Sequence, residues 1–320
     1  MKKLAPLLVF VYNRGELTKQ MLCAVNENDM AQYTDLYVFS DGPKKESDIE
    51  NVAAVRTIIH DFSQDNKFRT IHVLEAEKNK GLANSIISGV TQIINKYGNV
   101  IVLEDDLIVA KNFLKFMNDC LDFYKDNNKI WSIGGTTFKL KSLDNYSKDI
   151  YACYRGTSWG WATWSDRWGK VDWEVSDYDA FMNDRSRKAR FRRGGYEMVS
   201  ALQKQMEGKT DSWAIRWCYQ QSKENMFTIL PKKNLVMNIG MNGSGTHSGN
   251  HDYFHTKLDN EKFMYMLEDV EISEKIMREF RKYFLPLWPE YDLAKCYVNK
   301  VIDKFKKIRS ENLSEKDETV

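Results

Sequence analysis

The sequence predicts an α/β protein whose central sheet is mostly parallel and is flanked by helices. Over the first 140 residues, short runs rich in β-branched and aromatic residues alternate with longer segments of helical periodicity. Most of the short runs end in a polar or charged cluster. In an open parallel sheet, ligands bind beyond the carboxyl ends of the strands, so we expect these clusters to meet at one site. Taken singly, each cluster also fits an ordinary turn or helix cap.

The alternation places each element in order. Short apolar runs predict strands at residues 7–12, 35–40, 70–75, 100–104 and 130–134. Between them, helical periodicity predicts helices at residues 17–26, 49–61, 82–97 and 112–124. The third helix shows the clearest pattern, because its apolar residues recur three or four positions apart, as one buried face requires. These residues are Leu82, Ile86, Val90, Ile93 and Tyr97.

Composition excludes some classes of protein and partner. The 320 residues carry a formal net charge of +2 at pH 7, so no strong overall field attracts nucleic acid, and none is expected as a partner. No apolar run approaches the roughly 18 residues of a membrane-spanning helix. The cysteines are odd in number and far apart, and we interpret them as reduced thiols of a cytoplasmic protein. They are Cys23, Cys120, Cys153, Cys218 and Cys296.

The pattern changes near residue 141, where aromatic density rises and strands are hard to place. We expect three parts: an α/β half at residues 1–140, a second half continuous with it at 141–255, and a C-terminal helical extension at 256–320. Residues 293–308 form an amphipathic, lysine-rich pattern that we expect to pack on the body of the protein, with an anionic membrane surface as the alternative. The basic run at residues 185–193 is typical of a solvated helix face or a mobile loop, and less often of an anion site.

The acidic residues Glu104, Asp105 and Asp106 directly close the strand at 100–104. Three adjacent carboxylates repel one another and are costly to desolvate unless a cation or hydrogen-bond donors compensate. Oxygen ligands favour Mg²⁺ or Mn²⁺, whose remaining coordination positions phosphate oxygens and water commonly fill. The alternative is a helix N-terminus, where acidic residues are favourable, because a helix is expected soon afterwards.

Four segments carry a resemblance to a known family. Residues 10–14 (FVYNR), 38–42 (VFSDG), 102–110 (VLEDDLIVA) and 156–168 occur in the order seen in nucleotide-sugar glycosyltransferases of the GT-A fold. The chain resembles the group of N-acetylglucosaminyltransferase I and the protein O-mannose N-acetylglucosaminyltransferase. Through residues 160–164 (GWATW), it resembles bacterial haemolysin-like transferases of surface polysaccharides still more closely. The resemblance spans roughly residues 5–250 and implies a Rossmann-like GT-A fold.

The resemblance implies a role for each residue at the strand ends. Arg14 would contact the nucleotide or its phosphates, and Asp41 would accept a hydrogen bond from uracil. Glu104 and Asp105 would face the donor sugar and ribose, while Asp106 would bind a Mn²⁺ or Mg²⁺ ion that bridges the diphosphate. Outside this group of residues, a surface salt bridge would explain Arg14 and a turn would explain Asp41.

A general base and two further contacts follow from the same resemblance. Asp211 would take the proton of the acceptor hydroxyl in an inverting transfer, with helix N-capping as its alternative. His247, in the glycine-rich residues 240–249, would approach the diphosphate, although a structural histidine fits equally well. Trp161 and Trp213 would form an aromatic platform for the acceptor, while most tryptophans of this region are expected in the core.

The implied activity is metal-dependent, inverting transfer of a sugar, with N-acetylglucosamine as one candidate, from a UDP-sugar to a glycan hydroxyl. The implied setting is bacterial surface-polysaccharide synthesis with a glycan or lipid-linked oligosaccharide acceptor, in the cytoplasm or peripherally on the inner face of the membrane. One alternative is a sugar nucleotidyltransferase, which would carry a glycine-rich phosphate loop after the first strand, where this chain has only Gly15. The other is a non-catalytic carbohydrate-binding protein on a degenerate transferase fold.

Overall fold

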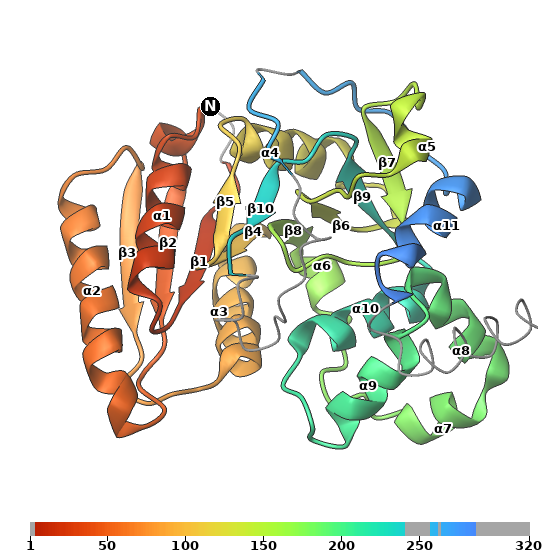
Figure 1. Cartoon of the computed structure of the whole chain (residues 1–320), viewed down its shortest axis with the longest axis horizontal. Coiled ribbons are helices and arrows are strands. Elements are labelled where there is room, and N and C mark those ends of the chain that lie inside the picture. The colour runs from red at the N-terminus through yellow and green to blue at the C-terminus, as the bar shows by residue number, and fades with distance from the viewer. Residues whose placement is uncertain (1–3, 241–256, 262–263, 286–320) are drawn as a thin grey trace, which may run out of the picture.

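The computed structural model describes residues 4–240, 257–261 and 264–285. Its centre is an eight-stranded sheet in the order β3-β2-β1-β4-β8-β6-β9-β7, with helices on both faces (Figure 1). A two-stranded ladder joins β5 (Leu107–Val109) to β10 (Val236–Asn238). The strands of the main sheet are β1 (Leu7–Val11), β2 (Asp35–Ser40), β3 (Thr70–Glu75), β4 (Asn99–Glu104), β6 (Ile130–Gly134), β7 (Ile150–Cys153), β8 (Trp161–Trp164) and β9 (Phe227–Pro231).

Six strands of the main sheet run in one direction, and β8 and β7 run in the opposite direction. The mostly parallel α/β class is therefore confirmed, and the arrangement is consistent with a Rossmann-like GT-A fold. All five predicted strands and all four predicted helices are present, with small differences in their bounds. The predicted helices are α1 (Gly15–Asn26), α2 (Ile49–Gln64), α3 (Leu82–Tyr97) and α4 (Phe113–Phe123).

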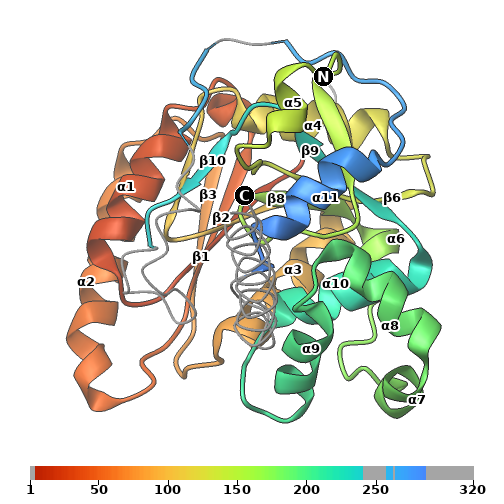
Figure 2. The same cartoon turned by 45° about the vertical axis from the view of Figure 1, so that its right-hand side comes forward.

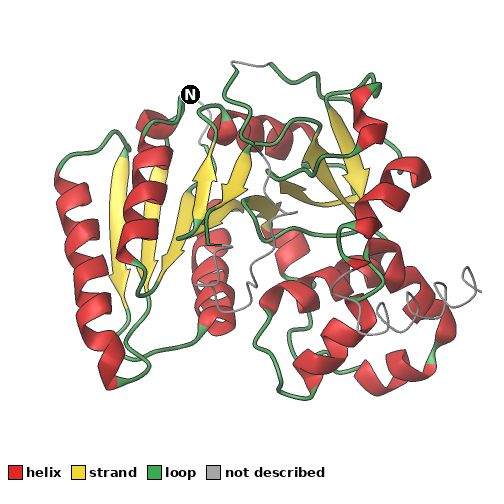
Figure 3. Cartoon of the chain, viewed as in Figure 1, coloured by secondary structure: helices red, strands yellow, loops and turns green. Residues whose placement is uncertain are grey.

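Alternation along β1 divides the core into two layers, because successive strand residues point to opposite faces of the sheet. Leu7, Val9 and Val11 pack in one cluster with residues of α1, α2 and α4. Leu8 and Phe10 pack in the other cluster with α3, α6 (Ser165–Trp168) and α10 (Trp213–Glu224). Figure 3 shows these helices on the two sides of the sheet. The carboxyl ends of the parallel strands are left as the polar edge.

The second half continues the same sheet and adds two smaller packing units. The strands β7, β8 and β9 all follow residue 140 and pair with strands of the first half or with one another. Besides α6 and α10, the described helices of this half are α5 (Lys141–Asp144), α7 (Tyr178–Asn183), α8 (Arg185–Phe191), α9 (Met198–Met206) and α11 (Glu274–Lys282). Helices α7 to α10 share a cluster of their own, and α11 packs beside α5 and β7 (Figure 1). The basic run at 185–193 is helical over most of its length, as expected.

Two expectations about the C-terminal part fall outside the described residues. The boundary at 255–256 and the amphipathic pattern at 293–308 both lie there. Within the described part of the chain, no helix combines the length and the apolar character needed to cross a membrane.

Asp35 ties the start of β2 to two other elements. Its carboxylate accepts hydrogen bonds from Arg69 Nε at 2.8 Å, Thr70 Oγ1 at 2.6 Å and the Tyr97 hydroxyl at 2.8 Å. Burial by itself raises the pKa of Asp35, but these donors outweigh it and hold the pKa well below its usual value. The ionised carboxylate therefore stabilises the folded state.

We predict that Asp35→Asn lowers the free energy of unfolding by about 2 kcal/mol near neutral pH. Because the folded pKa is depressed, this contribution is complete above the unfolded pKa of about 3.9 and is lost as the pH falls through the folded pKa. Urea unfolding of both proteins at neutral and acid pH should show a difference that shrinks in acid. The control is Asp61→Asn on the exposed face of α2. A difference that is absent at neutral pH, or constant with pH, would contradict the prediction.

Candidate active site

The candidate site lies where the parallel strands β1, β2, β3 and β4 end. These strands are neighbours in the order β3-β2-β1-β4, so the residues that follow them share one edge of the sheet. Arg14 follows β1, Asp41 follows β2, and Asp105 and Asp106 follow β4. The structure therefore brings together the strand-end residues that the sequence singled out.

Arg14 is the cation of this edge. Its Nε donates to Asp105 Oδ2 at 3.2 Å, and its Nη2 donates to Asp105 Oδ1 and lies 3.1 Å from Asp106 Oδ2. Arg14 is the residue before α1, so β1 and the helix start fix its backbone. Glu104, the last residue of β4, receives no hydrogen bond or ion pair from another described residue. If fully ionised, the four side chains would carry a net charge of −2.

The surroundings change the proton affinities of this group. Burial raises the pKa of Glu104 to about 8, and the nearby charges of Asp106 and Asp105 add to the increase. Burial also raises the pKa of Asp105 to about 6, although the Arg14 guanidinium opposes this change. Burial alone would lower the pKa of Arg14, but Asp105 and Asp106 outweigh it and hold the pKa above its usual value. The protein thus concentrates negative charge where little water can solvate it.

A second segment closes on Asp106. The ladder between β5 and β10 carries Ile239, whose amide donates to the Asp106 carbonyl at 2.8 Å. Gly240 follows, and a Cβ atom at this position would lie 2.4 Å from Asp106 Oδ2. Only a residue without a side chain lets this backbone approach the carboxylate so closely. The glycine-rich segment therefore begins directly against the acidic residues.

The donor set fits a hard divalent cation. It consists of carboxylate oxygens, the ligands that Mg²⁺ and Mn²⁺ prefer. One such ion would offset the charge of the ionised carboxylates, and the Glu104 side chain has no hydrogen bond or ion pair with another described residue. Among the described residues, no group of three or more Asp, Glu, His or Cys side chains is arranged to hold a metal ion. A cation here would take few protein ligands and would complete its shell with other oxygens.

Asp41 is more fully engaged than the sequence suggested. Its Oδ1 accepts from the amides of Gly42 and Lys80, each at 2.9 Å. Its Oδ2 accepts from Asn79 Nδ2 at 3.0 Å and from the Gly81 amide at 3.1 Å. A carboxylate has about four lone-pair sites, so a uracil contact would have to displace one of these donors. In this structure Asp41 holds the loop after β3, and the uracil contact stays a prediction.

Asp211 lies at the N-terminus of α3. Its Oδ2 accepts from the Ala83 amide at 3.4 Å, and its Oδ1 lies 4.0 Å from Arg216 Nη2. The side chain is 56% exposed, so the carboxylate is accessible from solvent. The expected alternative, N-capping of the following helix, is wrong: Ser212 caps α10, because its Oγ accepts from the Ile215 amide. Asp211 is therefore available for another role.

Trp161 and Trp213 correct the expected acceptor platform. Their exposed fractions are 1% and 2%, and their ring centroids lie 4.9 Å apart inside the core. Trp168 and Trp217 pack against Trp161 in the same cluster. A ring must expose a face to hold a sugar, and neither of these two rings does so. The tryptophans fill the space between β8 and α10 instead.

His247 lies outside the described residues, so its predicted approach to the diphosphate stays a prediction. Other residues of the edge were missed. Asn79 and Gly81 had a signal, because they belong to a polar cluster directly after a strand. Arg56 had none: from α2 it donates to Ser40 Oγ at 3.3 Å and to the Ala76 carbonyl at 2.7 Å, which ties the ends of β2 and β3 together.

Comparisons with known proteins were made at the level of sequence and of structure. No family model and no curated protein matches the sequence. Among solved structures, S. aureus TarS is similar with a TM-score of 0.31 and 14% identity, over 48% of this chain and 25% of the TarS chain. The chain thus spans about a quarter of TarS. A UDP-glucose pyrophosphorylase complexed with UDP-glucose is similar with a TM-score of 0.35 and 12% identity, over 71% of this chain and 90% of that chain. Likenesses this low carry no argument about function.

We predict that Trp161→Ala lowers the free energy of unfolding by about 3–5 kcal/mol, because it opens a cavity in the aromatic cluster. Denaturant unfolding measures this loss. The control is Tyr33→Ala, since that ring is 43% exposed; it should change stability by less than about 1 kcal/mol. A Trp161→Ala protein of unchanged stability would restore the idea of a surface platform.

Proposed function

We propose that the protein is a metal-dependent, inverting glycosyltransferase that moves a sugar from a UDP-sugar to a hydroxyl group of a glycan acceptor. The observation that carries the proposal is the strand-end group of Arg14, Glu104, Asp105 and Asp106, in which three carboxyl groups share one guanidinium. A nucleoside diphosphate is recognised by cations, and this group offers the Arg14 guanidinium and a set of carboxyl groups suited to a divalent ion. The family resemblance of the four sequence segments supports the same function.

The chain's own residues divide the work of donor binding. Asp106 is the proposed metal ligand, and the backbone of Gly240 lies directly against its carboxylate. When bound, the divalent ion would offset the charge that develops on the departing diphosphate. Arg14 contributes a fixed positive charge beside Asp105 and Asp106, where a phosphate oxygen can accept its hydrogen bonds. Glu104 and Asp105 then face the donor sugar and ribose.

Asp211 is the proposed general base. An inverting transfer needs a single carboxylate to take the proton of the attacking hydroxyl, unlike a glycosidase, which uses two. The carboxylate of Asp211 is more than half exposed and accepts one long hydrogen bond from the start of α3, so lone pairs remain for the acceptor. It lies beside Gly81, a residue of the loop that Asp41 holds.

The proposed acceptor is a glycan or a lipid-linked oligosaccharide of bacterial surface-polysaccharide synthesis.

The product of the reaction distinguishes the proposed transferase from the two alternative functions. A transferase releases UDP and lengthens the acceptor, whereas a sugar nucleotidyltransferase joins a nucleoside triphosphate to a sugar 1-phosphate, forms the nucleotide-sugar and releases pyrophosphate. A carbohydrate-binding protein would do neither. In this chain the residues after β1 contain a single glycine where a nucleotidyltransferase needs a phosphate loop.

We predict that Asp106→Ala weakens binding of Mn²⁺ by at least about tenfold, because it removes the proposed ligand from a site with few protein ligands. Titration followed by electron paramagnetic resonance of free Mn²⁺ measures this without any turnover. Asp61→Asn, which removes one carboxylate far from the strand ends, is the control. Unchanged Mn²⁺ affinity in Asp106→Ala would remove the metal assignment.

We predict that Asp211→Asn retains donor binding and loses sugar transfer by about 10²–10⁴-fold, the usual contribution of a general base. Calorimetry with the donor and a transfer assay with the same protein separate the two effects. An Asp211→Asn enzyme that transfers sugar at the parent rate would remove the base assignment while leaving the donor site intact.

A further inference from the structure

Positive charge is concentrated in two segments of the second half. Residues 185–193 contain six basic residues and no acidic one, and α11 contains four basic and two acidic residues. Together they carry a formal charge of +8, whereas the whole chain carries only +2. The remainder of the chain is therefore net acidic, and the molecule has a strongly basic region.

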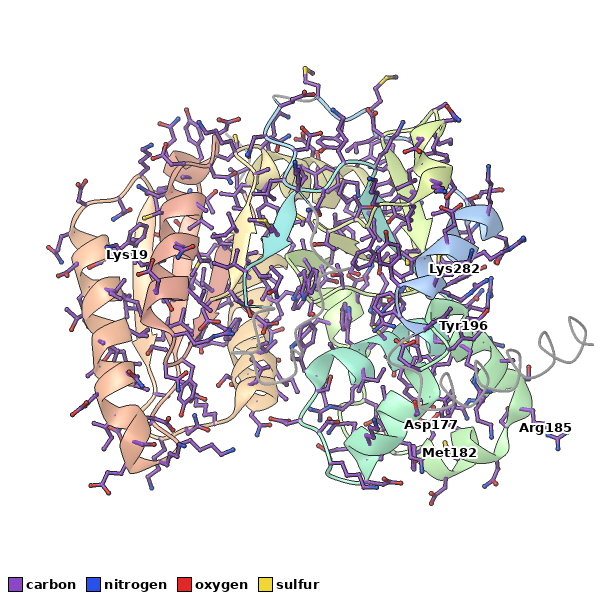
Figure 4. All side chains as sticks on the ribbon, in the orientation of Figure 1. Lys19, Asp177, Met182, Arg185, Tyr196 and Lys282 are labelled. Carbon is purple, nitrogen blue, oxygen red and sulfur yellow. The ribbon has the colours of Figure 1, made fainter. Side chains whose placement is uncertain are left out.

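The two segments form one surface. Arg281 of α11 donates from Nη1 to the Arg193 carbonyl at 3.2 Å, and Glu274 lies 3.7 Å from Arg281 and 4.0 Å from Arg193. Arg193 belongs to η3 (Arg192–Gly194), which directly follows α8. Figure 2, turned to bring this side forward, shows α8 and α11 facing the viewer. Figure 4 places Arg185, Tyr196 and Lys282 on this end of the molecule and Lys19 on the opposite end.

Some of these basic residues have internal partners. Arg187 pairs with Asp177 at 2.5 Å, and Lys188 donates to the Met182 carbonyl at 2.6 Å. Arg193 and Arg281 also have the partners described above, and six further basic residues are exposed and form no ion pair with another described residue. They are Arg185, Arg190 and Arg192 of the α8–η3 segment and Lys275, Arg278 and Lys282 of α11. These six exposed basic residues lie on two neighbouring segments and not on a single helix face.

A depression lies within this surface. It is lined by Arg190 and Arg193 together with Ser222, Asn225 and Tyr154. Arg193 lies over the Tyr154 ring, 3.5 Å from its centroid, which holds the guanidinium in place. The depression is too small to enclose a phosphate group, but guanidinium groups at its rim can donate to phosphate oxygens that approach the surface.

We propose that the α8–η3–α11 surface docks on the phosphate headgroups of an anionic lipid bilayer. Exposed clusters of four to eight basic residues bind such a surface with about 1 kcal/mol for each residue near it. The six exposed basic residues come from short elements that lie next to each other, since α11 contacts the segment after α8. An enzyme bound to the bilayer would lie in the same plane as a lipid-linked acceptor. The docking proposal depends on the charges of this surface and not on the proposed transfer reaction.

The test is co-sedimentation of the full-length protein with vesicles of phosphatidylcholine, with and without phosphatidylglycerol. We expect binding only to the anionic vesicles and a loss of binding as salt is added. Arg190→Glu combined with Arg192→Glu should weaken vesicle binding by at least about tenfold. The matched control is Lys19→Glu combined with Lys129→Glu, which changes the net charge equally on other exposed surfaces.

Each outcome supports or overturns the proposal that this surface binds an anionic bilayer. Equal vesicle binding by the Arg190/Arg192 variant and the parent would overturn the proposal, as would equal losses in the variant and the control. Stronger binding to an RNA or DNA oligonucleotide than to vesicles at equal phosphate concentration would assign the surface to nucleic acid. Thermal unfolding checks that both double variants are folded. Calorimetry with the nucleotide-sugar is independent of this surface, so a failed vesicle test and a failed donor test are distinguishable.

Discussion

Mutual repulsion among the carboxylates at the end of β4 is the constraint on which the site depends. Glu104 closes a buried strand, and Asp105 and Asp106 follow it directly, so little water is available to reduce their repulsion. Arg14 offsets part of this charge through its contacts with Asp105 and Asp106. The remaining negative charge is an unfavourable arrangement for a purely structural element, and a bound cation would offset it.

The surrounding backbone is built to hold this charge in place. Parallel strands bring the ends of β1 to β4 to one edge, and close backbone approaches then fix the loops that follow them. A Cβ atom at Gly42 would lie 2.6 Å from the carbonyl carbon of Lys78, so the loops after β2 and β3 are in direct contact. Gly240 makes the corresponding close approach to Asp106. Asp41 and Arg56 add hydrogen bonds across the same loops. The strand ends therefore act as one preorganised unit.

Local patterns in the sequence predicted the first half of the fold well. Apolar runs and helical periodicity are local signals, and buried parallel strands have the continuous apolar character that makes them visible, as in β1 and β4. The second half was harder, because β7 and β8 are short and pair only with strands distant in sequence. The sequence also could not separate buried from exposed tryptophans, because burial of a ring such as Trp161 depends on tertiary contacts and not on the residues next to it in the sequence. The hydrogen bonds that Asp41 accepts and the capping of α10 by Ser212 depend on the three-dimensional positions of their donors.

The central claim is that the strand-end group binds a nucleotide-sugar together with a divalent cation. The measurement that tests it most directly is calorimetric titration of the unmodified protein with a panel of UDP-sugars and other nucleotide-sugars, first with Mn²⁺ and then with EDTA. The account predicts that at least one donor binds in the presence of Mn²⁺ and that this binding disappears with EDTA. Absence of binding to every nucleotide-sugar under both conditions would contradict it.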